Sequence, residues 1–124
     1  MLQKECEKSD KVYCYMDKLA DMIGSDNSYI RTRGLTLIAY NAKWDKDNKI
    51  DEIIDEYLKH IEDVKLITAK QCIKLLPMIV KNKPELKCDI VSVLQKANIS
   101  IYAESMQSLV YKDIQNSLAE IEKL

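Results

Sequence analysis

The sequence predicts an all-α fold, an α-solenoid of about three antiparallel helical hairpins in a single domain of residues 1–124. Apolar residues recur with the 3.6-residue period of amphipathic helices, and this pattern returns every 34–38 residues or so. Two Gly and two Pro in 124 residues leave few signals for the many turns of a β fold. We expect hairpins over about residues 10–44, 48–81 and 84–124, with residues 1–9 as a tail or one extra helical turn.

The first helix of each expected hairpin carries a narrow apolar stripe. In the middle hairpin the stripe follows the positions i, i+3, i+4, i+7, i+8 and i+11. Asp47 or Asn48 is expected to cap that helix, and Ser9 or Asp10 the first one, which Gly24 should end. The stripes consist of Val12, Tyr15, Met16, Leu19, Met22 and Ile23, then Ile50, Ile53, Ile54, Tyr57, Leu58 and Ile61, then Leu86, Ile90, Val93, Leu94 and Ala97.

The second helices, over about residues 28–44, 65–81 and 102–124, are apolar over a wider arc. This breadth is expected for a layer wedged between neighbouring helices. Gly34 inside one of them predicts the close approach of another helix. Pro77 inside the next predicts a kink and a missing backbone hydrogen bond at Ile73. The apolar residues are Ile30, Leu35, Leu37, Ile38 and Ala42, then Ala69, Cys72, Ile73, Leu75, Leu76, Ile79 and Val80, then Ala103, Met106, Leu109, Val110, Ile114, Leu118 and Ile121.

Acidic residues in the turns precede basic residues on the second helices. The spacing from Asp26 to Arg33 is repeated from Asp63 to Lys70. This arrangement resembles the turn acid and second-helix arginine of HEAT repeats, although the spacing differs slightly. The resemblance to a short HEAT or armadillo-type repeat protein covers about residues 10–124 and implies that the second helices line a concave face. It bears on architecture more than on function.

The formal net charge of −1 conceals a segregation of charge along the chain. Residues 28–44 and 64–83 contain basic residues and no Asp or Glu, whereas residues 48–63 are mainly acidic. At 100° per residue, the basic side chains of the second helices share an arc that faces away from the apolar positions. The candidate partner-binding residues on this arc are Arg33, Tyr40, Lys43, Lys70, Lys74 and Lys81. The alternative is a solvated face whose Arg33 and Lys70 pair with the turn acids.

A concave basic surface attracts anionic partners. The first hypothesis is therefore a non-enzymatic interaction or scaffold module that binds an acidic peptide or protein partner. The alternative is a nucleic-acid-binding protein that contacts phosphates and uses Tyr40 as a stacking platform. Both a monomer and a homodimer are compatible with the pattern, since Leu118, Ile121 and Leu124 could pair between subunits.

Catalytic and cofactor motifs are absent from the sequence. There is no Gly-rich phosphate loop, no metal-ligand constellation and no Ser/His/Asp set, so we expect no enzyme, metal or cofactor. Trp44 and Asp45 resemble an aromatic–acid pair of HEAT-like alkylpurine DNA glycosylases, but we interpret Trp44 as a cap on the core and His60 as a surface residue. An enzymatic role would require Trp44, Asp45 or His60 to lie in a deep pocket.

The expected location is a bacterial or archaeal cytoplasm. The four cysteines contain no C-x-x-C pair and are interpreted as reduced thiols. No apolar run approaches the roughly 20 residues that span a bilayer, so no membrane partner is expected. The cysteines are Cys6, Cys14, Cys72 and Cys88.

Overall fold

The computed structural model describes residues 12–124, which form α-helices and 3-10 helices and contain no β-strand. This confirms the prediction of an all-α fold. The expected tail and the expected caps Ser9 and Asp10 lie outside the described residues. The α-helices are α2 (Met16–Ile23), α3 (Ser28–Tyr40), α4 (Lys49–Leu58), α5 (Leu66–Asn82), α6 (Lys87–Lys96) and α7 (Glu104–Glu122). The 3-10 helices are η1 (Tyr13–Tyr15), η2 (Ala42–Trp44), η3 (Lys59–Glu62), η4 (Pro84–Leu86) and η5 (Ile99–Ile101).

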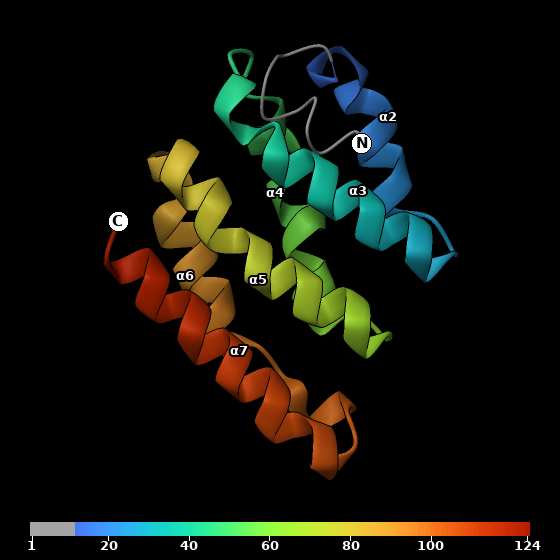
Figure 1. Ribbon diagram of the computed structural model, residues 1–124, viewed down its shortest axis with the longest axis vertical. Helices are drawn as coiled ribbons and strands as arrows, with labels where there is room; N and C mark the ends of the chain where they lie inside the picture. Colours follow the sequence, from blue (N-terminus) through green and yellow to red (C-terminus); the bar gives the residue numbers. More distant parts are fainter. Residues whose placement is uncertain (1–11) are drawn as a thin grey trace.

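Three helices, α3, α5 and α7, lie side by side in this order and form one layer (Figure 1). The central helix α5 contacts both of its neighbours in the layer. Behind the layer, α2 packs against α3, η3 against α5, and α6 against α7. The outer face of α3, α5 and α7 is therefore opposite the face that the remaining helices cover. Within residues 12–124, no helix is both long and apolar enough to cross a membrane.

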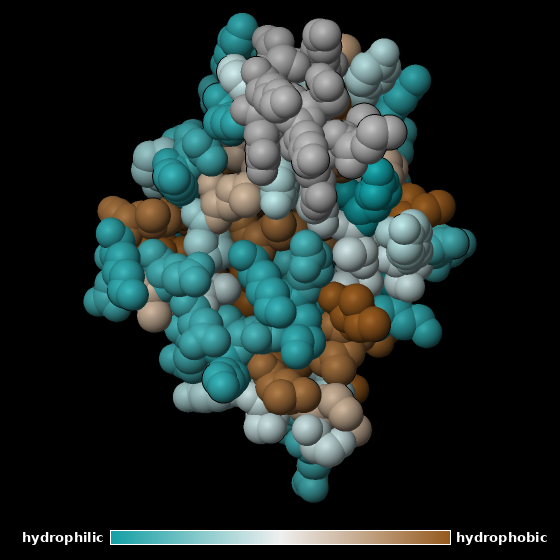
Figure 2. Space-filling view, viewed as in Figure 1, coloured by the Kyte–Doolittle hydropathy of each residue, from teal (hydrophilic) through white to brown (hydrophobic). Residues whose placement is uncertain are grey.

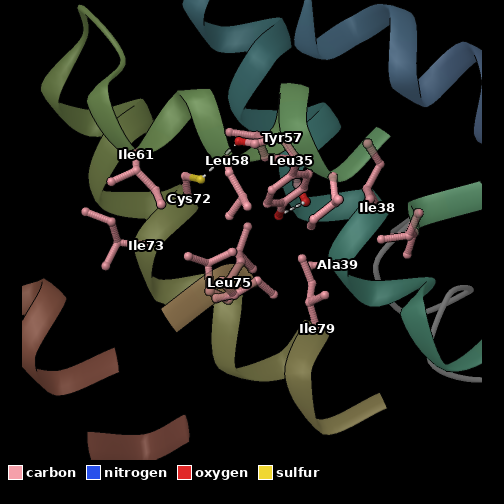
Figure 3. Close-up of a cluster of buried hydrophobic side chains, with 14 of the residues drawn as sticks. Leu35, Ile38, Ala39, Tyr57, Leu58, Ile61, Cys72, Ile73, Leu75 and Ile79 are labelled. Carbon is pink, nitrogen blue, oxygen red and sulfur yellow. Dashed lines mark hydrogen bonds between the residues drawn. The ribbon is translucent and has the colours of Figure 1, made fainter. Parts of the chain in front are cut away.

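The hydrophobic core lies between the two sets of helices (Figure 3). Tyr57 of α4 is fully buried there, and its hydroxyl donates a hydrogen bond to the Leu35 carbonyl at 2.8 Å. The thiol of Cys72 faces the Tyr57 carbonyl at 3.6 Å, and burial raises the pKa of both side chains. The Tyr57 hydroxyl and the Cys72 thiol are thus both buried with a hydrogen-bond partner.

Several stripe residues that were predicted to be buried are exposed. Ile30 is 38% exposed in the first turn of α3. Met106 and Leu109 are 38% and 44% exposed, because no described helix covers the outer side of α7. The wide arc of apolar residues expected of a helix between two neighbours is therefore buried on α5 and only partly buried on α7.

The turn before α4 differs from the prediction. Asp47 and Asn48 do not cap this helix; the carboxylate of Asp45 accepts hydrogen bonds from the N–H groups of Lys49 and Ile50 at 2.9 and 3.0 Å. Asn48 instead adopts a left-handed backbone with φ of 55°, and its side-chain oxygen accepts a bond from the Lys83 ammonium at 2.7 Å. A left-handed residue before the helix allows a more distant acid to reach the orphan N–H groups.

Gly34 marks the close approach of α2 and α3, as the sequence predicts. A Cβ atom built on Gly34 would lie 2.8 Å from Cβ of Met22. Because a Cβ atom cannot rotate away, any larger residue at position 34 would push the two helices apart.

Pro77 lies inside α5, which continues through it from Leu66 to Asn82. Proline has no N–H, so the carbonyl of Ile73 loses its partner within the helix. Ser117 of α7 replaces that partner: its buried hydroxyl donates to the Ile73 carbonyl at 2.7 Å. The backbone defect predicted at Ile73 is thus repaired by a side chain from the neighbouring helix.

We expect Ser117→Ala to lower the free energy of unfolding by about 1–3 kcal/mol, because it leaves a buried carbonyl without a donor. In a Pro77→Ala background the cost should shrink, since an alanine at this position restores the N–H that bonds the Ile73 carbonyl. Urea unfolding of the two single variants and the double variant measures this coupling. An equal cost of Ser117→Ala in both backgrounds would contradict the repair.

Candidate functional site

A pocket of about 680 Å³ opens between α3 and the start of α5. Its volume falls within the range of ligand-binding clefts in proteins. Figure 2 shows hydrophobic side chains on the outer face of the layer around the first turns of α5. We call this feature the α3/α5 pocket. Its walls are Ser28, Tyr29, Thr32, Arg33, Thr36 and Leu37 from one side, and Lys65, Leu66, Ile67 and Thr68 from the other.

Two large apolar side chains of the pocket wall are exposed to solvent. Tyr29 is 75% exposed on the first turn of α3, and Ile67 is 78% exposed on the first turn of α5. Deeper in the pocket, Leu37 is buried and Leu66 is half-buried against the core. Exposed apolar residues that converge on a concavity with an apolar floor are typical of binding sites.

The charges in the pocket wall have one sign. Arg33 and Lys65 are exposed, and the wall contains no Asp or Glu. The Asp63 carboxylate accepts a hydrogen bond from the Lys65 N–H at the N-terminus of α5 and offsets the positive end of the helix dipole, so the positive charge at the pocket comes from the Arg33 and Lys65 side chains. The electrostatic potential at the pocket therefore favours an anionic ligand.

Hydroxyl groups hold the two walls of the pocket together. The Oγ1 atoms of Thr32 and Thr68 are 2.8 Å apart, and one of them donates to the other. Farther along, the side-chain amide of Gln71 donates to Oγ1 of Thr36 at 3.3 Å. These contacts fix the spacing of α3 and α5 at the pocket floor. The pocket is accordingly a preformed feature of the folded chain.

Asp63 anchors both walls from behind. Its carboxylate accepts two hydrogen bonds from the Arg31 guanidinium, at 2.9 Å each, and one from the backbone N–H of Lys65 at 2.9 Å. Burial alone would raise the pKa of Asp63, but the hydrogen bonds from Arg31, Lys65 and His60 outweigh it and lower the pKa. Tyr102 also donates its hydroxyl to the Asp63 carbonyl. One turn residue thus ties α3, the start of α5 and the segment before α7 together.

This network differs from the acid–base pairs that the sequence suggested. Asp63 pairs with Arg31, and Arg31 also donates to the backbone carbonyls of Ser25 and Asp26 at 3.0 and 3.1 Å. Arg33 takes no part in these contacts and faces the pocket instead. His60, interpreted as a surface residue, is half-buried with its Nδ1 atom 2.7 Å from Asp63.

Asp45 belongs to a second buried polar cluster. Besides capping α4, it accepts hydrogen bonds from the Tyr13 hydroxyl at 2.6 Å and from the Lys83 ammonium at 2.9 Å. Burial would raise its pKa, but the bonds from Tyr13, Lys83 and the backbone lower it overall. Burial and the bond to Asp45 raise the pKa of Tyr13 to about 12. Trp44 packs against the core, and neither it nor Asp45 lines the α3/α5 pocket.

The predicted binding residues on α5 are not equivalent. Lys74 and Lys81 are exposed on the outer face of the helix. Lys70 is half-buried, and its ammonium lies 3.6 Å from a carboxylate oxygen of Asp113 on α7. The positive charge of Lys70 is therefore partly neutralised by the neighbouring helix.

Of the predicted residues on the first basic segment, only Arg33 lines the α3/α5 pocket. Tyr40 is half-buried and packs against the core. Lys43 lies in η2, with its ammonium 5.2 Å from the centre of the Trp44 ring. The structure thus places five of the six predicted residues on α3 and α5 and the sixth, Lys43, in η2, and it does not gather them in one site.

Sequence reasoning missed Tyr29, Lys65 and Ile67. A signal for two of them exists in the helical periodicity. Ile67 precedes Lys70 by three residues, and Tyr29 precedes Arg33 by four, so each falls on the polar arc of its helix. An apolar residue on a polar arc indicates exposed hydrophobic surface at that point.

Neither a possible metal site in the described residues nor a match to a known protein adds information about the pocket. In the part of the chain that the structure describes, no group of three or more His, Cys, Asp or Glu side chains could hold a metal ion. Cys14, Cys72 and Cys88 form no disulfide, and Cys6 lies outside the described residues. No protein-family model, curated protein or solved structure matches this chain.

Proposed function

We propose that the chain is a HEAT-like α-solenoid and a non-enzymatic interaction module, which binds an acidic peptide or protein partner through the outer face of α3 and α5. One observation carries the proposal: the wall of the α3/α5 pocket contains two cationic side chains and no anionic one. Lys74 and Lys81 extend the positive charge along α5. An acidic partner gains from every one of these charges, and a basic partner would be repelled.

Contacts at a regular sequence separation support the repeat architecture. In a solenoid each hairpin contacts the next, so partners are separated by about one repeat. Five residue pairs with polar contacts in this chain are separated by 32 to 39 positions. These pairs are Tyr13 with Asp45, Arg31 with Asp63, Thr32 with Thr68, Asp45 with Lys83, and Asp63 with Tyr102.

The apolar part of the pocket favours a protein partner over a nucleic acid. Tyr29 and Ile67 offer apolar surface that the apolar side chains of a protein can cover, whereas phosphate contacts do not use it. The number of cations for phosphate contacts is also reduced, because Arg31 and Lys83 are buried in ion pairs. The cations of the pocket wall are not in buried ion pairs and form a short basic rim around the apolar α3/α5 pocket.

The test is fluorescence anisotropy with a labelled acidic, helix-forming peptide and a labelled single-stranded oligonucleotide. We expect the peptide to bind, and the double charge reversal Arg33→Glu/Lys74→Glu to weaken it at least about tenfold, or roughly 1.4 kcal/mol. The matched control Lys96→Glu/Lys123→Glu reverses two exposed charges outside the pocket and should leave binding nearly unchanged.

Two results would overturn the proposal. If the peptide does not bind at tens of micromolar protein and low salt, the basic face is a solvated surface. If the oligonucleotide binds more tightly, with a log–log salt slope of about −0.7 per neutralised phosphate and the same loss on charge reversal, the partner is a nucleic acid.

A further inference from the structure

We infer that the α3/α5 pocket receives the apolar side chains of a short amphipathic helix in the partner, whose acidic residues face the basic rim. This inference rests on the proposed function and deepens it, because it names the form in which the acidic partner is recognised. It follows from the length of the pocket, the chemistry of its walls and the sign of its charges.

On its α3 side the pocket has the length of a helix footprint. Its wall on α3 runs from Ser28 to Leu37, which spans about 13 Å at a helical rise of 1.5 Å per residue. Apolar residues at positions i, i+3, i+4 and i+7 of a docked helix span about 10 Å on the same measure. A volume of about 680 Å³ accommodates several side chains rather than one.

The walls offer apolar surface at the rim and floor. The exposed faces of Tyr29 and Ile67 stand on opposite sides of the opening, and Leu37 and Leu66 lie below them. The threonine hydroxyls at the floor bond mainly to one another and to backbone carbonyls, so they do not demand polar partners. Apolar anchors can therefore enter without leaving a buried donor unpaired.

Charge complementarity defines the polar side of the ligand. Arg33 and Lys65 stand at the rim on either side of the pocket, and neither forms an ion pair within residues 12–124. Carboxylates that flank the apolar stripe of a helix would reach both cations. Ion pairs with such carboxylates contribute more binding energy beside a partly covered apolar site than in open solvent, because the local dielectric constant is lower.

A second copy of this chain is a distinguishable occupant. The exposed Met106 and Leu109 of α7 lie on one helix with Glu104, Asp113 and Glu120. Docking of α7 into the pocket of another molecule would be head-to-tail and would produce rings or open assemblies, whose population rises with concentration. The oligomeric state therefore separates self-association from the binding of another protein.

The experiment uses two labelled peptides of equal charge. Both are 16-residue acidic helix formers; one carries Leu at positions i, i+3, i+4 and i+7, and the other carries Ala there. We expect the Leu peptide to bind wild-type protein at least about tenfold more tightly than the Ala peptide. The variant Tyr29→Ala/Ile67→Ala should abolish most of this difference, and the charge-dependent part of binding should remain.

The matched control is Val64→Ala/Tyr111→Ala. Val64 and Tyr111 are 83% and 51% exposed and do not line the pocket, so this variant removes similar apolar surface elsewhere. It should bind the Leu peptide within about twofold of wild type. Because all four side chains are exposed, both variants are expected to remain folded, which circular dichroism verifies.

The possible results distinguish failure of the pocket inference from failure of the proposed function. Equal binding of both peptides would overturn the pocket inference and leave the proposed acidic partner standing. Binding of neither peptide would remove the proposed function as well. Concentration-dependent assembly in light scattering that Tyr29→Ala/Ile67→Ala abolishes would overturn the inference in favour of a second copy.

Discussion

Replacing Asp45 by Ala is expected to lower the free energy of unfolding by about 3–5 kcal/mol, because its buried carboxylate accepts four hydrogen bonds and a buried donor left without an acceptor costs about 1–3 kcal/mol. The side chain of Asp45 is fully buried, and the Lys83 side chain beside it is only 4% exposed. The substitution leaves the Tyr13 hydroxyl and the Ile50 N–H without their acceptor. Since a typical domain is stable by about 5–15 kcal/mol, this one change removes a large part of the total.

Guanidinium unfolding followed by circular dichroism measures the effect. The matched control is Asp47→Ala, which removes an exposed carboxylate two residues away and should change stability by no more than about 0.5 kcal/mol. Adding Lys83→Met to Asp45→Ala should not restore the loss, because the Lys83 ammonium keeps the carboxylates of Asp51 at 2.5 Å and Glu85 at 3.2 Å when Asp45 is gone. A cost of Asp45→Ala no larger than that of Asp47→Ala would show that the cluster contributes little.

The helical content was predictable because apolar periodicity reports it directly. The stripe from Ile50 to Ile61 corresponds to α4 and η3, and all of its residues except the half-buried Ile53 are buried. Gly34 and Pro77 were also informative, because each is unfavourable inside a helix and therefore predicts an interaction with a neighbouring helix. The neighbouring residues are Met22, which approaches Gly34, and Ser117, which bonds the Ile73 carbonyl, and no local sequence pattern identifies them.

The polar partners were less predictable because they are set in three dimensions. Asp63 lies seven residues before Lys70 and 32 residues after Arg31, and the structure selects the distant residue. Net charge per helix likewise overstated the basic face, since Lys83 is buried beside Asp45 and Lys70 faces Asp113. A charge count does not show which cations are paired, whereas binding depends on those that are not.

Replacing Asp63 by Ala is expected to cost a similar 3–5 kcal/mol and also to disturb the α3/α5 pocket. Without the carboxylate, Arg31 is a buried cation and the N–H of Lys65 loses its acceptor. Both walls of the pocket are then less firmly held, so the Leu peptide should bind more weakly even under conditions where the variant is folded. Glu62→Ala, which removes the exposed carboxylate next to it, should change neither property.

The dependence of stability on pH tests the same interaction without a gross change of shape. The folded-state pKa of Asp63 is lowered, so its ionised form contributes stability that is complete above the unfolded-state pKa of about 3.9. That contribution declines as the pH falls through the folded-state value. The difference in unfolding free energy between wild type and Asp63→Asn should therefore be largest near pH 7 and shrink progressively below about pH 5. A difference that stays constant down to pH 2 would mean that the charge of Asp63 does not stabilise the fold, and that its hydrogen bonds alone hold α3 to α5.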